Sequence, residues 1–375
     1  MTISSVVEEK HGLEVKGSSL EILSLSKRLD RFKVLDEVTM SIEPAEIIVV
    51  VGPSGSGKTT LLKLIAGLLK VDSGRILIDG VEVASPTRHV PPQARHVGYL
   101  PQDYALFPNL TVYENVAIAL RVKSSKSSLR ERALELIEFV GLSGYEDKYP
   151  NQLSGGQQQR AALARALAAD PKVLLLDEPM SSLDVKTRER LRGELRCMLK
   201  RLGITTVYVT HDLNDATAIS DKIALLIHGR LLQYGLIDEV LACPATPEIG
   251  DFLGTNCYDG VVVSEDTVVL SHGIVMKIGV KTNQRRGSKL LVSFRPDEPS
   301  ILKERPSIRD NVYRGVVVNL MRTKCNMKVV VDIGVCVNIE LSRREYESLN
   351  IKVGDQVYVH IPKEAINAYS IKSSL

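Results

Sequence analysis

Eight consecutive residues have the composition and spacing of a phosphate-binding loop. They fit the pattern GxxxxGK[ST] and are Gly52, Pro53, Ser54, Gly55, Ser56, Gly57, Lys58 and Thr59. Glycines let backbone N–H groups curl around phosphate oxygens, and a helix that starts there adds the positive end of its dipole. We expect Lys58 to reach the β- and γ-phosphates of a nucleotide and the Thr59 hydroxyl to hold Mg²⁺, with Thr60 beside them.

Two acidic residues follow an apolar run farther along the chain. Val173–Leu176 leads directly into Asp177 and Glu178. A parallel strand delivers such residues to the carboxyl edge of its sheet, where ligands bind in open α/β sheets. We expect Asp177 to orient Mg²⁺ through its water shell and Glu178 to polarise the attacking water. Alone, a strand that ends in Asp-Glu is ordinary, and the upstream phosphate loop favours the catalytic interpretation.

A second candidate anion cradle precedes a helical pattern over 158–169. It contains Ser154, Gly155, Gly156 and Gln157. These residues leave free N–H groups at a helix start, although an ordinary N-cap with a turn has the same composition. Two phosphate cradles and one Mg²⁺ site in a single chain suggest a symmetric dimer. Each ATP would then lie between one copy's phosphate loop and the Ser154 segment of the other copy.

The elements that position these residues form an α/β pattern. Strand-like runs at 47–51, 173–176 and 205–209 alternate with helical spacing at 59–69 and 185–202. Strands separated by helices predict a mostly parallel sheet. We therefore expect a phosphate-loop nucleotide-binding domain.

The character of the chain changes after Cys257. Short strand-like runs separated by turn residues predict a small β-barrel domain, in which only 343–349 has a helical pattern. The expected organisation is a polar extension over 1–18, an α/β domain over 19–254 with a helical subdomain at about 95–165, and a β-rich regulatory and dimerisation domain over 255–375.

Composition excludes several classes of protein. The 375 residues are 44% hydrophobic and 25% charged, which is ordinary for a globular chain, and no apolar run is long enough for a membrane-spanning helix. The net charge of +3 and the 5% aromatic content are too low to favour nucleic-acid binding. Five cysteines without a CxxC pair fit reduced thiols in the cytoplasm.

Six motifs in a fixed order make the sequence similar to the ATP-binding-cassette (ABC) transporter ATPases. They are GPSGSGKT, GYLPQD, LSGGQQQR, LLLDEP, the segment Ser181-Ser182-Leu183-Asp184, and VTHD. The resemblance covers about 230 residues and implies an ATPase that uses ATP and Mg²⁺.

The resemblance also implies roles for three further residues. Gln102 would contact Mg²⁺ and signal to a membrane partner, Asp184 would bridge the dimer, and His211 would be the switch histidine that reads the γ-phosphate. One position departs from the pattern. Leu29 stands where the family has an aromatic residue that stacks on adenine, so either Phe32 substitutes or Leu29 packs on the base.

The domain order resembles that of importer ATPases with a C-terminal oligonucleotide/oligosaccharide-binding-like (TOBE) regulatory domain. This resemblance implies a homodimer at the cytoplasmic face of the membrane, with separate permease subunits and an extracytoplasmic solute-binding protein as indirect partner. The segment 90–115 is similar to molybdate/tungstate and sulfate importers, and sugar, polyamine or iron cargo stays open. Arg343 and Arg344 resemble part of a regulatory oxyanion site, but Glu345 replaces a hydroxyl there and a carboxylate disfavours an anion.

Two rival functions remain open at the level of sequence. A soluble ABC ATPase that acts on nucleic acid or ribosomes would carry strong basic patches, and we expect no nucleic-acid partner. A scaffold that binds ATP without hydrolysing it would not need Glu178 or His211.

Overall fold

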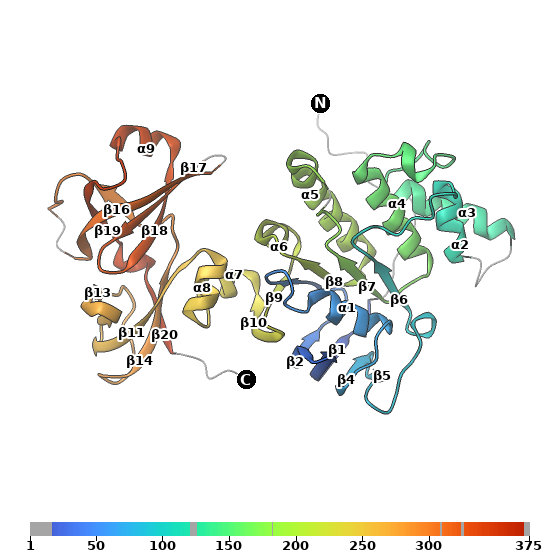
Figure 1. The fold of residues 1–375 in the computed structure, drawn as a ribbon, viewed down its shortest axis with the longest axis horizontal. Helices are drawn as coiled ribbons and strands as arrows, with labels where there is room; N and C mark the ends of the chain where they lie inside the picture. The colour runs from blue at the N-terminus through green and yellow to red at the C-terminus, as the bar shows by residue number, and fades with distance from the viewer. Residues whose placement is uncertain (1–16, 121–125, 182, 308–309, 324–325, 371–375) are drawn as a thin grey trace. The chain divides into compact units, whose positions relative to one another are not determined.

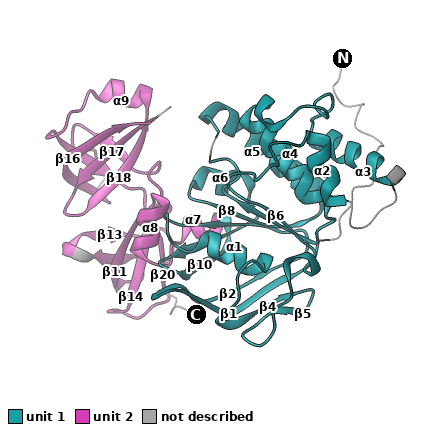
Figure 2. Cartoon of the chain, turned by 45° about the vertical axis from the view of Figure 1, so that its right-hand side comes forward, with its two compact units in different colours: residues 1–237 teal, residues 238–375 magenta. Residues whose placement is uncertain are grey.

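The computed structural model describes residues 17–120, 126–181, 183–307, 310–323 and 326–370. The chain divides into two compact units, residues 1–237 and residues 238–375 (Figure 2). Residues 1–16 of the expected N-terminal extension lie outside the described ranges. None of the helices in those ranges is long and apolar enough to cross a membrane.

The first unit contains a six-stranded sheet in the order β10-β9-β3-β8-β7-β6 (Figure 1). Every neighbouring pair is parallel except β9 with β10, which confirms the expected mostly parallel sheet. The strands are β3 (Ile47–Val51), β6 (Val97–Leu100), β7 (Val173–Asp177), β8 (Thr205–Thr210), β9 (Lys222–Ile227) and β10 (Arg230–Leu236). The helices that accompany it are α1 (Lys58–Ala66), α4 (Gly155–Ala168), α5 (Val185–Leu202) and α6 (Leu213–Ile219).

A second, antiparallel sheet belongs to the same unit and was not predicted. Its order is β2-β1-β4-β5, with β1 (Leu20–Leu29), β2 (Phe32–Ile42), β4 (Ser73–Ile78) and β5 (Val81–Ala84). Fully buried side chains from both sheets and from α1 share one hydrophobic core, for example Ile22, Val50 and Leu61. The core therefore fixes the start of α1 against β3, where the phosphate-binding motif lies.

Three helices form most of the helical segment expected at about 95–165, although its first residues belong to the strand β6. They are α2 (Val112–Leu120), α3 (Lys126–Phe139) and α4, and they lie beside one another in Figure 1. Val112, Val116 and Leu120 are buried at helical spacing on α2, which explains why this segment packs as helices.

The second unit is β-rich, as predicted, but its strands form two sheets. Both are antiparallel and five-stranded, in the orders β13-β12-β11-β14-β20 and β15-β19-β16-β17-β18, and their inner faces share one hydrophobic core. The strands of the first are β11 (Asn256–Ser264), β12 (Thr267–Leu270), β13 (Val275–Lys277), β14 (Lys289–Phe294) and β20 (Asn367–Ser370). Those of the second are β15 (Ser300–Leu302), β16 (Val312–Arg322), β17 (Asn326–Asp332), β18 (Cys336–Ser342) and β19 (Gln356–His360). The helix α9 (Arg343–Leu349) matches the predicted helix.

The division between the units falls at residues 237/238, whereas the sequence placed the boundary at 254/255. Two short helices, α7 (Ile237–Ala242) and α8 (Pro247–Leu253), occupy the difference. Side chains of the β-rich unit hold the end of α7 and the residues that follow it. Ser293 Oγ donates to the Ala242 carbonyl at 2.8 Å, and the Tyr369 hydroxyl donates to the Pro244 carbonyl at 2.8 Å. Helical spacing alone does not reveal which unit a linking helix joins.

Candidate functional site

The phosphate-binding motif forms the connection from β3 to α1. Gly57, directly before the helix, has a φ of 100°, which other residues rarely adopt. A Cβ at Gly52 would come within 1.9 Å of the Leu226 carbonyl oxygen, so no side chain fits there. Lys58 is buried and donates from Nζ to the carbonyls of Gly52 and Pro53 at 2.8 and 2.9 Å. The loop therefore bends around the lysine head group, as a phosphate cradle requires.

Charge and burial at this loop fit a polyanionic ligand. Burial lowers the pKa of Lys58, and the nearby carboxylates of Glu178 and Asp177 oppose that change. The Ser56 hydroxyl is buried and has no hydrogen-bond partner among the described residues. A buried polar group without a partner is unfavourable, and a phosphate oxygen at the loop would supply one. Of the other predicted loop residues, Pro53, Ser54 and Gly55 are exposed, and Thr60 is half-buried.

Asp177 lies at the end of β7 and faces the hydroxyl of Thr59. Thr59 Oγ1 donates to Asp177 Oδ1 at 3.0 Å, and the Tyr99 hydroxyl donates to Asp177 Oδ2 at 3.1 Å. Burial raises the pKa of Asp177, while the hydrogen bonds from Thr59 and Tyr99 lower it. A hydroxyl beside a carboxylate is an oxygen donor set that suits Mg²⁺. Sequence reasoning missed Tyr99, which lies on β6 three residues before Gln102.

The buried carboxylate predicts a trade between stability and function. Because the folded pKa of Asp177 is raised, its ionisation destabilises the fold. This contribution to stability is favourable below the unfolded pKa near 3.8 and is lost as the pH rises through the folded value. We expect Asp177→Asn to raise the thermal midpoint of the nucleotide-free protein at pH 7 and to leave it nearly unchanged at pH 3.5. Scanning calorimetry in EDTA at both pH values tests this, and a lower midpoint at pH 7 would contradict it. Mg²⁺-dependent turnover should fall in the same variant.

Glu178 and His211 form a pair at the same edge of the sheet. Glu178 Oε2 lies 3.0 Å from His211 Nδ1. The strands β3, β8 and β7 are parallel neighbours, so the residues that follow them lie at the same edge of the sheet. Glu178 has a φ of 44°, a left-handed conformation that is uncommon for a residue with a side chain and that clusters at functional sites. The geometry presents a carboxylate oxygen beside the phosphate loop with an imidazole to orient it.

Gln102 lies in an exposed turn after β6, and no hydrogen bond joins it to Thr59 or Asp177 within the described chain. The turn itself is firmly held. The Tyr104 hydroxyl donates to the Pro179 carbonyl at 3.0 Å. Arg165 of α4 donates to the carbonyls of Tyr104 and Ala105 at 2.8 and 2.6 Å. These contacts link the Gln102 turn both to the segment after Glu178 and to α4, and sequence patterns did not indicate them.

Ser154 is the N-cap of α4. Its hydroxyl accepts a hydrogen bond from the Gln157 N–H, and its own N–H donates to Gln157 Oε1 at 2.9 Å, which completes a capping box. Ser154 is exposed, and no hydrogen bond joins it to the phosphate loop of the same chain in the described structure. Cβ atoms at Gly155 and Gly156 would lie 2.9 and 3.1 Å from side-chain atoms of Leu183 and Leu191. The segment therefore forms a capped helix start, and its surface position leaves it available to another chain.

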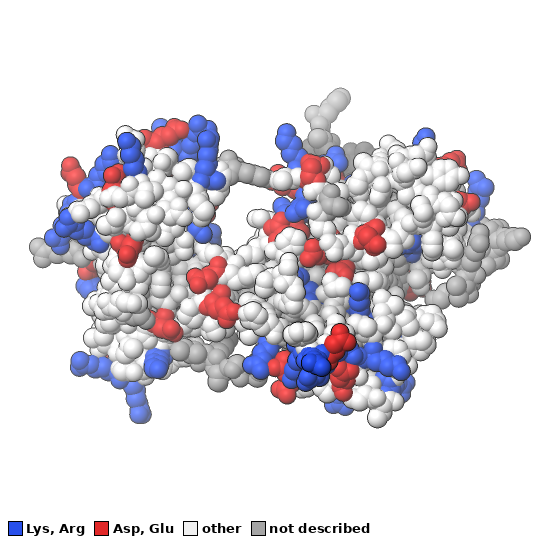
Figure 3. Space-filling model, in the orientation of Figure 1, with Lys and Arg blue, Asp and Glu red and all other residues white. Residues whose placement is uncertain are grey.

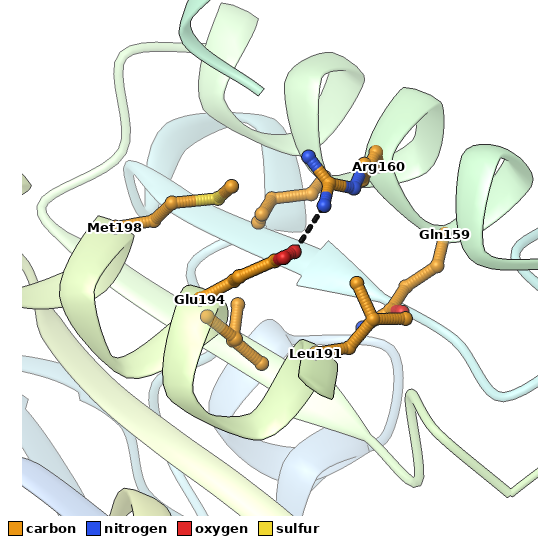
Figure 4. A pocket seen from close by; sticks show the side chains of 7 residues that line it. Gln159, Arg160, Leu191, Glu194 and Met198 are labelled. Atoms are coloured by element: carbon orange, nitrogen blue, oxygen red, sulfur yellow. Dashed lines mark hydrogen bonds and ion pairs between the residues drawn. The ribbon is translucent and has the colours of Figure 1, made fainter. Parts of the chain in front are cut away.

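Side-chain contacts connect the helices α4 and α5. Arg160 and Glu194 point toward each other across the two helices and form an ion pair (Figure 4). Arg160 Nη1 also donates to the Val140 carbonyl at 2.8 Å. At the start of α5, the exposed Asp184 side chain caps the helix by accepting from the Thr187 N–H, whose hydrogen bonds lower the pKa of Asp184. Ser182, quoted with Asp184 in the sequence motif, lies outside the described residues.

The hairpin between β1 and β2 lies against the phosphate loop. Leu29 and Phe32 are paired at its tip and are 40% and 78% exposed. A Cβ at Gly57 would come within 2.7 Å of the Val34 carbonyl, which places the start of β2 beside the loop. Phe32 is thus an exposed aromatic ring two residues from a contact with the cradle.

Comparisons with known proteins agree with this geometry. The ABC transporter family model matches residues 35–181. The chain is 41% identical to a spermidine/putrescine import ATP-binding protein of Thermotoga maritima, over 80% of this chain and 83% of that protein. It is 39% identical to a molybdate/tungstate import ATP-binding protein of Thermococcus kodakarensis, over 76% and 84%. It is 38% identical to a sulfate/thiosulfate import ATP-binding protein of Nitrosomonas europaea, over 91% and 95%.

Solved structures give the same result for part of the chain. A dimeric bacterial ABC transporter cassette matches with a TM-score of 0.53 and 34% identity, covering 58% of this chain and 98% of that one. A dimeric post-hydrolysis state of the same cassette, bound to ADP and phosphate, matches with a TM-score of 0.52.

Proposed function

The chain belongs to the ABC transporter family as the ATPase of an importer, and we propose that its cargo is an oxyanion such as molybdate, tungstate or sulfate. The ATPase function is supported above all by one observation. Lys58, Thr59, Asp177, Glu178 and His211 come together at the carboxyl edge of three adjacent parallel strands. The relatives named as molybdate/tungstate and sulfate/thiosulfate importers support the oxyanion cargo.

The chemistry of the site follows from these residues. Lys58 and the loop N–H groups bind the phosphates, and Thr59 with Asp177 would hold Mg²⁺, which neutralises phosphate charge when bound. Glu178 accepts a proton from the water that attacks the γ-phosphorus, and His211 holds the Glu178 carboxylate in place. The bond between the γ-phosphorus and the bridging oxygen breaks, and ADP and phosphate leave.

Adenine requires a separate support, and we assign it to the tip of the β1–β2 hairpin. Phe32 supplies the exposed ring and Leu29 the apolar neighbour opposite it. Base stacking on an aromatic face tolerates many geometries, so a ring on the second strand can replace one on the first.

Two copies acting together would complete the ATP site. The Ser154 segment is exposed on α4 and does not reach its own phosphate loop, so the nucleotide would be gripped by one copy's Lys58 and the other copy's Ser154. The dimeric cassettes among the solved relatives support this arrangement. Closure would carry α2–α4 and the Gln102 turn, through which the pair pulls on separate permease subunits at the cytoplasmic face of the membrane. A solute-binding protein would deliver cargo from the other side.

Ser154→Arg should separate nucleotide binding from dimer closure. An arginine in this segment would place a bulky cation at the interface while the chain's own phosphate loop stays intact. We expect unchanged affinity for Mg²⁺-ATP and loss of ATP-driven dimerisation, with turnover reduced by at least about tenfold. Size-exclusion chromatography with light scattering measures the dimer, and Ser128→Arg on α3 is the matched control. Normal ATP-dependent dimerisation of Ser154→Arg would contradict the shared-site arrangement.

Cargo can be tested by uptake in cells that lack the native gene. Cells complemented with the wild-type chain should take up labelled molybdate or sulfate, and cells carrying Glu178→Gln should not. Uptake of putrescine or spermidine instead would favour the polyamine alternative, which the Thermotoga relative supports. Sugar or iron uptake would identify the remaining alternatives.

The α9 segment does not support a regulatory anion site. Ser342 and Glu345 form a capping box at its start, and Arg343 Nε donates to Glu347 Oε1 at 2.8 Å. The hydrogen bonds from Ser342 lower the pKa of Glu345. The carboxylates of Glu345 and Glu347 therefore lie at this segment, and Glu347 already accepts from Arg343, which disfavours a bound oxyanion there.

The rival functions make different predictions. On the face drawn in Figure 3, basic and acidic side chains are intermingled over both units. A nucleic-acid ATPase would show DNA or RNA affinity with a steep salt dependence. A scaffold would bind ATP and show no hydrolysis in a steady-state assay even with its membrane partners.

A further inference from the structure

A ring of hydrogen bonds closes around the Glu178–His211 pair. Its backbone half starts at the Glu178 carbonyl, which accepts from the Ser181 N–H at 3.1 Å and from Ser181 Oγ at 3.0 Å. The Ser181 carbonyl in turn accepts from Arg188 Nη2 at 3.1 Å. Arg188 therefore grips the turn that follows Glu178.

The other half of the ring returns through the switch histidine. Arg188 Nη1 donates to Asp212 Oδ2 at 3.3 Å. Asp212 directly follows His211, whose Nδ1 lies 3.0 Å from Glu178 Oε2. The Arg188 side chain thus connects the backbone behind Glu178 with the residue behind His211.

Of the two charged side chains Arg188 and Asp212, Arg188 is the one whose orientation depends on the hydrogen bonds of this ring. Asp212 is fixed from other directions, because Arg192 Nη2 donates to it at 2.8 Å and its Oδ1 caps α6 by accepting from the Asn214 N–H at 2.9 Å. Arg188 Nη2 also lies 3.4 Å from the Leu183 carbonyl. The Arg188 Nε is buried without a hydrogen-bond partner among the described residues, so the acceptors at the two Nη atoms determine how the guanidinium lies.

Arg188 also lies one turn inside α5. Its N–H donates to the carbonyl of Asp184, the exposed N-cap of α5 that the resemblance to ABC ATPases implies would bridge the dimer. Any displacement of Ser181 or Leu183 therefore moves acceptors of the Arg188 guanidinium.

We propose that Arg188 is a positioning residue that couples Ser181, Leu183 and Asp184 to His211, so that docking of a second copy aligns Glu178 for hydrolysis. This inference rests on the proposed roles of Glu178, His211 and the dimer. Arginine suits the task because its planar fork donates to two acceptors in different directions at once, whereas lysine is a single point charge.

Arg188→Lys in the full-length chain tests the coupling. The variant keeps the charge and loses the fork, so Glu178 and His211 are held less accurately. A misplacement of about 1 Å at a reacting group can reduce turnover by about 10²-fold. We expect kcat to fall by about 10- to 100-fold while KM for ATP changes by less than about threefold. Arg190→Lys is the matched control, since Arg190 lies on the same helix, is 71% exposed and pairs with Glu194.

A second variant protects the test against a simple loss of folding. Asp212→Asn keeps a good N-cap for α6 and weakens the charge-assisted bond to Arg188. If both residues act through one link, the double variant should be no slower than the slower single variant. A kcat within twofold of wild type for Arg188→Lys, or additive losses in the double variant, would overturn the coupling. The coupling would also be overturned if kcat, the affinity for ATP and the thermal midpoint all fell together in Arg188→Lys.

The coupling and the proposed function can fail separately. If Glu178→Gln is inactive and Ser154→Arg fails to dimerise while Arg188→Lys turns over normally, only the coupling is wrong. If Glu178→Gln turns over at the wild-type rate, the assignment on which the coupling rests is wrong.

Discussion

Glu178→Gln is expected to lower kcat for ATP by about 10²- to 10⁴-fold, which is the contribution of a positioned general base. Glutamine has nearly the same shape but cannot accept the proton of the attacking water. The phosphate loop, Thr59 and Asp177 are untouched, so affinity for Mg²⁺-ATP should stay within a few fold. The stalled chain should therefore accumulate as an ATP-bound dimer.

Single-turnover hydrolysis and equilibrium nucleotide binding separate these two effects. Glu138→Gln is the matched control, because it makes the same change at an exposed position on α3. Turnover of Glu178→Gln within about threefold of wild type would show that another group accepts the proton.

Lys58→Ala is expected to weaken binding rather than the chemical step alone. Lys58 is 5% exposed, and removing one partner of a buried charged pair costs about 2–5 kcal/mol. That range corresponds to roughly 30- to 5,000-fold in Kd for ATP. The cavity left by the side chain would also leave the carbonyls of Gly52 and Pro53 without their present donor.

Isothermal titration with Mg²⁺-ATP measures this loss, and turnover at saturating nucleotide shows what remains of the chemistry. Lys70→Ala provides the control, since Lys70 is exposed just beyond α1. Unchanged affinity in Lys58→Ala would mean that the Gly52–Thr59 loop does not hold the phosphates.

Local patterns predicted the elements that carry the site with close agreement. The apolar run at 47–51 is β3, and the helical spacing at 185–202 is α5, which ends where Gly203 has a φ of 60°. Short-range sequence signals determine these elements, namely a continuous apolar run for β3 and a glycine C-cap for α5. Because three such strands are parallel neighbours, the residues after them could be expected at one edge.

Long-range contacts limited the rest of the prediction. In the antiparallel sheet of the first unit, the partner and the register of each strand depend on residues far apart in the sequence. The alternation of buried and exposed side chains along β1 and β2 does not identify those partners. Tyr99 contacts a residue 78 positions away, and Arg165 contacts one 61 positions away. In the sequence, Arg188 resembles an ordinary charged residue on the surface of a helix. Only the structure shows its hydrogen-bond acceptors. Such residues act through tertiary contacts that no local motif contains.

The proposed mechanism requires that two copies of the chain share one nucleotide. Structure determination of the Glu178→Gln variant with Mg²⁺-ATP tests this directly. We predict a symmetric pair in which Lys58 of one copy and Ser154 of the other lie within hydrogen-bonding distance of the same triphosphate. A pair, or a monomer, in which ATP is bound at Lys58 and every Ser154 is remote from nucleotide would contradict it.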